Sequence, residues 1–107
     1  MAELDPEGPA LSHRVVSEKD GQVVLAIGGE LDMTTVEELR GAVEDAVAAA
    51  TELLVLDVER LRFADSSAIA LWVSWSQRVP RVEIHNATPM IRRVIQTMGL
   101  TAKLNPS

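Results

Sequence analysis

The sequence predicts a mixed α/β domain with the element order β-β-α-β-α-β-α. Short segments in which apolar residues alternate or run continuously suit strands, and segments between them repeat apolar residues at spacings of three and four, which suits helices. The chain has 107 residues, of which 47% are hydrophobic, so it has room for one core but not for two domains. Right-handed crossovers then place the helices against a largely parallel, mixed sheet of four to five strands.

The first elements are expected to form a hairpin. Residues 1–10 contain two prolines and three acids without apolar periodicity, which predicts a flexible tail. Strands are predicted at residues 11–18 and 22–28. The turn between them, Lys19-Asp20-Gly21, contains a glycine that tolerates a positive φ.

A helix is predicted after the run Gly29-Glu30-Leu31-Asp32. Thr34 with Glu37, or Thr35 with Glu38, has the spacing of a capping box. The residues that recur at helical spacing, and so define its buried face, are Val36, Leu39, Val43 and Val47.

The middle of the chain predicts a buried strand and a second helix. Residues 53–58 (LLVLDV) form a nearly continuous apolar run, which is typical of a central strand covered on both faces. After a short loop, Ser66 or Ser67 is expected to cap a helix that runs to Gln77 or Arg78, before Pro80 stops it.

A strand at residues 81–85 and a last helix complete the prediction. Thr88 is expected to cap that helix, with Pro89 at its first position. Gly99 suits the left-handed residue that ends it, and Leu100 is placed to fold back on the last turn. The expected buried stripe of this helix consists of Ile91, Val94, Ile95 and Met98.

Composition excludes several classes of function. The formal net charge of -6 disfavours binding to nucleic acid or to anionic lipid, and the chain has no cysteine for disulfides or thiolate chemistry. The longest apolar stretch, residues 68–73, is far shorter than the roughly 20 residues of a membrane span. His13 and His85 have no companions at ligand spacing, so neither a metal nor a cofactor is expected. The sequence therefore predicts a soluble, cytoplasmic protein that acts on other proteins.

The candidate functional site is Asp65-Ser66-Ser67. It follows a central strand and opens a helix, the position at which open α/β sheets usually carry their sites. A phosphate on either hydroxyl would face the unpaired amides of the helix and add about -1.5 to -2 charges. Capping alone explains the same residues. Asp65 either fixes this loop by accepting backbone hydrogen bonds or is a first-turn acid, and the residues alone explain Asp32 as a turn or cap aspartate.

Four ordered motifs resemble STAS domains, in particular bacterial anti-sigma factor antagonists. They are Gly-Glu-Leu-Asp at 29–32, Leu-Val-Leu-Asp-Val at 54–58, Phe-Ala-Asp-Ser-Ser-Ala-Ile at 63–69, and Thr-Pro-Met-Ile-Arg-Arg-Val at 88–94 leading to Gly99-Leu100. The resemblance covers about residues 11–104 and implies the STAS fold, which leaves residues 1–10 and 105–107 as tails.

The resemblance implies a partner switch. Ser66, with Ser67 as second choice, would be phosphorylated by an anti-sigma factor that is also a serine kinase, and a phosphatase would reverse the modification. The unphosphorylated form would bind the anti-sigma factor and free the sigma factor, so the protein would be a substrate and not an enzyme. The implied partner-binding residues are Asp32, Asp65, Ser66, Ser67, Ala68 and Ile69, with Ala68 standing where the family usually has glycine.

Other interpretations stay open. A STAS subunit of a phospholipid ABC transporter, which binds the ATPase without being phosphorylated, also fits the apolar run from Ala68 to Trp75. Trp72 and Trp75 are either core or a partner or self-association surface, and Arg92 and Arg93 either a solvated face or a partner contact. A receiver domain phosphorylated on Asp57 is disfavoured because the first strand does not end in paired acids. An enzyme is disfavoured because the chain lacks a nucleophile elbow and a glycine-rich phosphate loop.

Overall fold

The computed structural model describes residues 10–107, so the predicted tail lies outside the described residues except for Ala10. The elements in chain order are β1 (Leu11–Lys19), β2 (Gln22–Leu31), α1 (Val36–Ala42), α2 (Glu44–Ala49), β3 (Leu53–Asp57), β4 (Leu61–Ala64), α3 (Ser66–Ser76), β5 (Val82–His85), α4 (Pro89–Thr97) and α5 (Thr101–Leu104). The mixed α/β class and the predicted order are confirmed, with β4 and α5 as elements that the sequence did not reveal.

The sheet has five strands in the order β1-β2-β3-β5, and β4 pairs with β2. β1 and β2 form the predicted antiparallel hairpin, whose turn residues Asp20 and Gly21 have φ values of 55° and 79°. The other pairings are parallel. β2 is long enough to take two partners, because β3 pairs with residues 22–26 and β4 pairs with residues 29–31. The short segment taken as a loop before α3 is therefore a strand, and its end is held against the end of β2.

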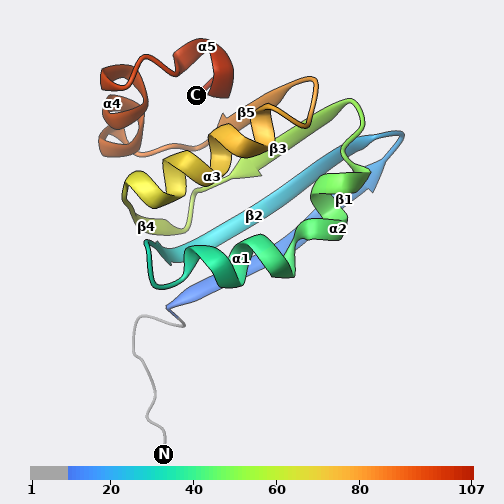
Figure 1. Cartoon of the computed structure of the whole chain (residues 1–107), viewed down its shortest axis with the longest axis horizontal. Coiled ribbons are helices and arrows are strands. Elements are labelled where there is room, and N and C mark those ends of the chain that lie inside the picture. The colour runs from blue at the N-terminus through green and yellow to red at the C-terminus, as the bar shows by residue number, and fades with distance from the viewer. Residues whose placement is uncertain (1–9) are drawn as a thin grey trace, which may run out of the picture.

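The helices cover one face of this sheet, as Figure 1 shows for α1, α2 and α3. Leu54 and Leu56 of β3 belong to the core cluster under these helices, whereas Val55 between them is buried (6% exposed) outside that cluster. Val24, its neighbour on β2, is only half-buried. The prediction that this strand is covered on both faces holds for the buried Val55, but no described helix lies over that face, because the described helices pack on one side of the sheet alone.

Both tryptophans are part of the core. Trp72 and Trp75 on α3 are 0% and 1% exposed, which confirms the packing interpretation of these residues.

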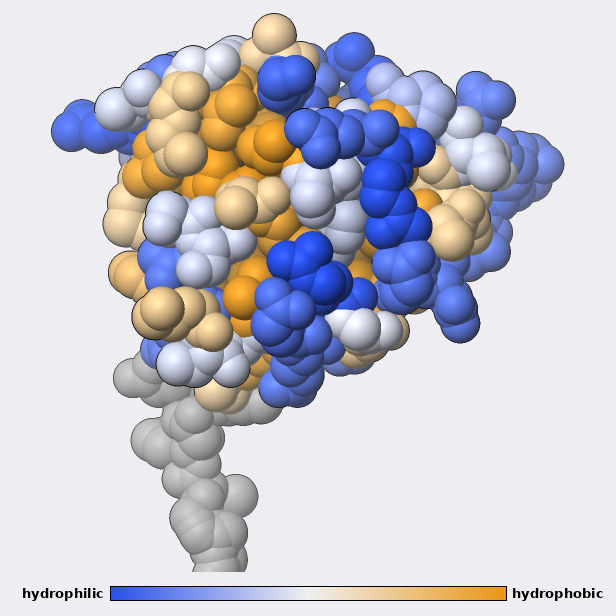
Figure 2. Space-filling model, viewed as in Figure 1, coloured by the Kyte–Doolittle hydropathy of each residue, from blue (hydrophilic) through white to orange (hydrophobic). Residues whose placement is uncertain are grey.

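In Figure 2, hydrophilic side chains cover most of the region of α1 and α2, and apolar surface shows mainly toward α4 and α5.

The helix predicted over residues 36–47 bends at Val43, where φ is -112° and ψ is 13°. The amide of Val43 still donates to Leu39, and the amide of Val47 still donates to Val43, so hydrogen bonding continues through the bend. Gly41, a poor helix former, stands two residues before it. The predicted apolar face is confirmed, because all four of its residues are buried.

The end of the chain departs from the prediction in three places. Thr88 caps α4 and Gly99 has a φ of 72°, both as predicted, but Met98 is 48% exposed and not part of the buried stripe. The chain then continues into α5. Residues 105–107 are not a free tail, because the amide of Ser107 donates to the carbonyl of Ile84 (2.8 Å) and pairs the segment with the outer edge of β5.

Candidate functional site

Two loops meet where β2 and β4 end. The register of these parallel strands sets Leu31 opposite Ala64, so the residues that follow, Asp32 and Asp65, leave the sheet side by side. The amide of Asp65 donates a hydrogen bond to the carbonyl of Leu31 (N···O 3.2 Å). Figure 1 shows both connections at the same end of the sheet, one entering α1 and the other entering α3. The structure thus brings together two motifs that lie more than thirty residues apart.

Asp65 is the N-cap of α3. Its backbone is extended (φ -108°, ψ -168°), and its Oδ1 accepts a hydrogen bond from the amide of Ser67 at 2.8 Å. The prediction that Ser66 or Ser67 caps the helix is wrong, because a short carboxylate one residue earlier already takes the first-turn amide. Of the two interpretations of Asp65, the structure supports the one in which it fixes the loop.

Capping by Asp65 leaves both serines in the first helical turn. Ser66 is exposed and Ser67 is half-buried. No hydrogen bond within residues 10–107 engages the Ser66 hydroxyl, so it holds no part of the described structure in place. An exposed hydroxyl at the start of an eleven-residue helix lies at the positive end of the helix dipole. That environment stabilises an added anion.

Asp32 organises the neighbouring turn. Its Oδ1 accepts hydrogen bonds from the amide (2.8 Å) and the hydroxyl (2.6 Å) of Thr34. The Thr34 hydroxyl and amide lower the pKa of Asp32, because they stabilise its ionised form, so this carboxylate carries its charge at neutral pH.

The predicted capping box is wrong, because both threonines use their hydroxyls within the turn that Asp32 organises. Thr34 bonds back to Asp32, and Thr35 donates to the carbonyl of Glu30 (2.9 Å) instead of accepting from the first turn of α1. Glu37 forms an exposed ion pair with Arg40. The turn interpretation of Asp32 is therefore supported, and the partner-surface interpretation is compatible with it because Asp32 is only half-buried.

Two of the predicted partner-binding residues cannot offer their side chains. Ala68 and Ile69 are 0% and 1% exposed and belong to the core cluster. Their side chains are therefore not part of a contact surface, and they pack in the core beneath the serine loop instead. The methyl group that Ala68 adds relative to the family's usual glycine faces the interior, so it does not obstruct access to Ser66.

Two exposed apolar side chains flank the same loops and were missed in the sequence. Met33, next to Asp32, is 75% exposed, and Phe63, two residues before Asp65, is 43% exposed. Phe63 lies on β4 opposite Glu30, with Leu61 and Ala64 of the same strand buried. Strand periodicity could not have given this signal, because alternation would place Phe63 on the same face as the buried Leu61, and the pairing of β4 with β2 is irregular between Gly29 and Glu30.

The remaining candidates lie elsewhere. His13 is exposed on β1, and His85 on β5 contacts Glu83 (3.0 Å). Arg92 and Arg93 are exposed on α4. Among residues 10–107, no three histidine or acidic side chains are grouped so as to hold a metal ion, and no helix is long and apolar enough to cross a membrane.

These features define a class of small α/β domain that displays a serine at a helix N-terminus beside two aspartate-organised turns. The family model described as "Mlab, STAS domain" matches residues 15–105. The anti-sigma-F factor antagonist RsfB of Mycobacterium tuberculosis is 30% identical over 88 residues, which cover 79% of this chain and 72% of that protein. The chain belongs to the STAS domain family and, within it, to the anti-sigma factor antagonists.

Solved structures agree on the fold. An anti-sigma factor antagonist from Mycobacterium paratuberculosis superposes with a TM-score of 0.78 at 24% identity, covering 95% of this chain and 87% of that one. The Bacillus cell fate determinant SpoIIAA in its phosphorylated form gives a TM-score of 0.66 at 29% identity over 92% of this chain and 91% of that one. A chain of the Acinetobacter MlaFEDB complex gives 0.61 at 21% identity over 87% of this chain and all (100%) of that one, a likeness of fold alone.

Proposed function

We propose that this protein antagonises an anti-sigma factor by partner switching controlled at Ser66. The unphosphorylated form binds the anti-sigma factor and thereby releases a sigma factor. Phosphorylation of Ser66 by the anti-sigma factor, acting as a serine kinase, abolishes that binding, and a phosphatase restores it. The observation that carries the proposal is the exposed Ser66 hydroxyl at a helix N-terminus whose cap is supplied by Asp65.

The physical effect of the phosphate follows from that geometry. It would add about -1.5 to -2 charges beside the ionised Asp32 turn and the Asp65 cap. The fold tolerates it, because the hydroxyl makes no described hydrogen bond and the helix dipole favours an anion. A partner that buries this surface would have to desolvate the new charge, which is costly without a cation to pair it. SpoIIAA, a relative in fold and sequence, has been solved in a phosphorylated form.

The proposed partner surface consists of the two joined loops and their exposed flanks. Asp32, Asp65, Ser66 and Ser67 supply its polar part, and Met33 and Phe63 supply apolar area that a partner can bury. The protein is then the substrate of the kinase and of the phosphatase and itself catalyses nothing. It works in the cytoplasm, where sigma factors act.

Incubation of the purified chain with its cognate kinase and ATP tests the proposal. Mass spectrometry should find one added phosphate, located on Ser66. Ser66→Ala should prevent its incorporation, whereas the matched control Ser67→Ala should not. Phosphate found on Ser67 alone, or none with a kinase that binds the chain, would overturn the assignment of the site.

A STAS scaffold subunit of a phospholipid ABC transporter is the second candidate. The description of the matching family model and the fold likeness to a chain of the MlaFEDB complex favour it. The 30% identity to RsfB favours the antagonist. The genes beside the coding sequence separate the two, since the antagonist predicts a serine kinase and a sigma factor, and the scaffold predicts a transporter ATPase and permease.

A further inference from the structure

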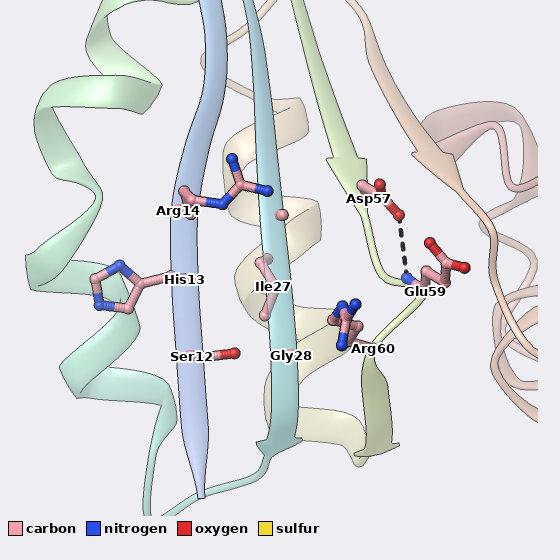
Figure 3. Close-up of a pocket in the computed structure, with 9 residues that line it drawn as sticks. Ser12, His13, Arg14, Ile27, Gly28, Asp57, Glu59 and Arg60 are labelled. Carbon is pink, nitrogen blue, oxygen red and sulfur yellow. Dashed lines mark hydrogen bonds between the residues drawn. The ribbon is translucent and has the colours of Figure 1, made fainter. Parts of the chain in front are cut away.

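The sheet face without described helices carries a pocket that the proposed switch does not use. Its volume is about 450 Å³, and its walls and floor include Arg14, Ala26, Gly28, Asp57, Glu59 and Arg60. Figure 3 looks onto this face, with α3 behind the sheet. The pocket therefore lies on the side of the sheet opposite the helix that presents Ser66.

Charges of both signs line this pocket: Arg14 lies on β1, and Asp57, Glu59 and Arg60 lie on β3 and the loop after it. Arg14, Ala26 and Asp57 occupy one row across β1, β2 and β3. Neighbouring strands lie about 4.8 Å apart, so the backbones of Arg14 and Asp57 are roughly 10 Å apart with the methyl group of Ala26 as the floor between them. Figure 3 shows the Arg14 side chain reaching over β2, with Asp57, Glu59 and Arg60 on the other side of that strand.

The charged groups are available to a ligand. Within residues 10–107, neither Arg14 nor Arg60 forms an ion pair, and their guanidinium groups have no hydrogen-bond partner. Asp57 is held in place, because its Oδ1 accepts from the amide of Glu59 (3.1 Å) and from Asn86 Nδ2 (3.0 Å). Its second oxygen remains able to accept from a ligand.

Gly28 keeps the pocket open at its narrow end. A Cβ on Gly28 would lie 2.6 Å from Ser12 Oγ and 3.1 Å from the Cβ of Arg60. A side chain there would push β1 and the loop after β3 apart or displace Arg60. This glycine is therefore explained by close approach and not by its backbone conformation.

We propose that this pocket binds a small zwitterion of about dipeptide size. The anionic end lies against Arg14, and the ammonium end lies against Asp57 and Glu59 on the other side of Ala26. An extended dipeptide spans about 7 Å, which is less than the roughly 10 Å between the backbones of Arg14 and Asp57, so it can lie over Ala26 between them. A simple anion leaves the acidic wall unpaired, and a simple cation leaves the guanidinium groups unpaired. This inference does not depend on the proposed switch at Ser66.

Titration of the ¹⁵N-labelled full chain with alanylalanine tests the proposal by NMR. Saturable shifts are expected at the amides of Ala26, Gly28 and Glu59. N-acetyl-alanylalanine lacks the cationic end and alanylalanine amide lacks the anionic end, so each should bind at least tenfold more weakly, equivalent to about 1.4 kcal/mol. Equal binding of the acetylated probe would show a plain anion site and overturn the proposal, as would the absence of saturable shifts with alanylalanine.

Variants locate the binding. Arg14→Gln and Asp57→Asn should each weaken alanylalanine binding at least tenfold, and Asp57→Asn keeps the oxygen that accepts from Glu59. Gly28→Ala should narrow the site and weaken binding as well. Arg93→Gln, at an exposed position of α4, is the matched control and should bind as the unmodified chain does. Unchanged affinity in both Arg14→Gln and Asp57→Asn, with their spectra still those of the folded chain, would overturn the proposed orientation and site.

Discussion

The amide of Asp65 donates a hydrogen bond to the carbonyl of Leu31, and this bond joins the ends of β2 and β4. It fixes the start of α3 relative to the Asp32 turn, because the next residues on both strands leave the sheet together. The exposed serine is therefore presented by rigid elements on both sides. Such support matters for a recognition surface, because a partner loses less affinity to ordering when the surface is already ordered.

Removal of the Asp65 carboxylate should destabilise the fold by about 1 kcal/mol, since the first-turn amide of α3 loses its acceptor. Asp65→Asn keeps a side-chain oxygen in that place and should lose much less than Asp65→Ala. Urea unfolding of the three proteins measures the difference. If Asn and Ala are equally destabilising, the hydrogen bond to Ser67 is not the source of the effect.

A carboxylate at position 66 should weaken binding to the anti-sigma factor without unfolding the chain. Ser66→Asp adds one charge at an exposed position where the helix dipole favours an anion, so its stability should stay within about 0.5 kcal/mol of the unmodified protein. Affinity measured by calorimetry should fall, whereas Ser66→Ala should bind normally. Ala48→Asp, at an exposed position of α2, controls for the change in net charge. Equal losses in both aspartate variants would mean that the added charge acts at long range and not at the Ser66 contact.

Much of the fold could be predicted because it rests on local periodicity. The apolar spacing of α1 and α2 and the Thr88 cap of α4 are properties of a few neighbouring residues. The missed parts depend on distant ones. β4 is a strand because β2 continues past residue 28 and offers it an edge, and residues 105–107 are ordered because β5 offers them another.

The candidate site, too, could be predicted where it depends on neighbouring residues and not where it depends on distant ones. The motif Asp-Ser-Ser contains three residue types that all favour the N-cap, so sequence preference could not decide which one caps α3. The structure decides it through the bond from Asp65 to Leu31, which holds Asp65 in the extended conformation that a cap needs. The exposure of Met33 and Phe63 was likewise invisible, because it depends on where two loops meet.

Trp72 should tolerate replacement by phenylalanine better than its burial suggests. Its indole Nε1 is a buried donor without a partner in the described structure, and such a donor costs roughly 1–3 kcal/mol. Trp72→Phe removes that cost while it loses volume, whereas Trp75→Phe only loses packing. We expect Trp72→Phe to be the less destabilising of the two by about 1 kcal/mol in denaturant unfolding. The reverse order would indicate that the Trp72 nitrogen has a partner in solution.

Acid should destabilise the fold through three carboxylates. Hydrogen bonds from Thr34, Arg78 and Arg81 lower the pKa values of Asp32, Glu44 and Glu83 respectively. A folded-state pKa below the unfolded value contributes stability that is present above the unfolded pKa of about 4 and is lost as pH falls through the folded pKa. The free energy of unfolding should therefore decline below about pH 5.

The Glu44 contribution can be isolated because it is a bidentate pair between α2 and the end of α3. Glu44→Gln should flatten the decline between pH 5 and 3 relative to the unmodified chain, with Glu52→Gln as an exposed control. The change is expected to be small, since exposed ion pairs are screened by water and salt. An acid profile that is unaltered by Glu44→Gln would show that the Arg78 pair does not persist in solution.

Phe63 should be the main apolar anchor of the proposed partner surface. Its ring is 43% exposed on β4, close to Asp65 in the chain, while the buried residues of that strand hold the backbone in place. Phe63→Ala should therefore change stability by less than about 1 kcal/mol but weaken anti-sigma factor binding by about 1–3 kcal/mol, the range of a typical anchor residue. Met98→Ala, which removes a side chain of similar exposure (48%) from the end of α4, is the matched control. Calorimetry measures the affinity of both variants for the anti-sigma factor. Equal affinity of Phe63→Ala and Met98→Ala would place the partner away from the serine loop.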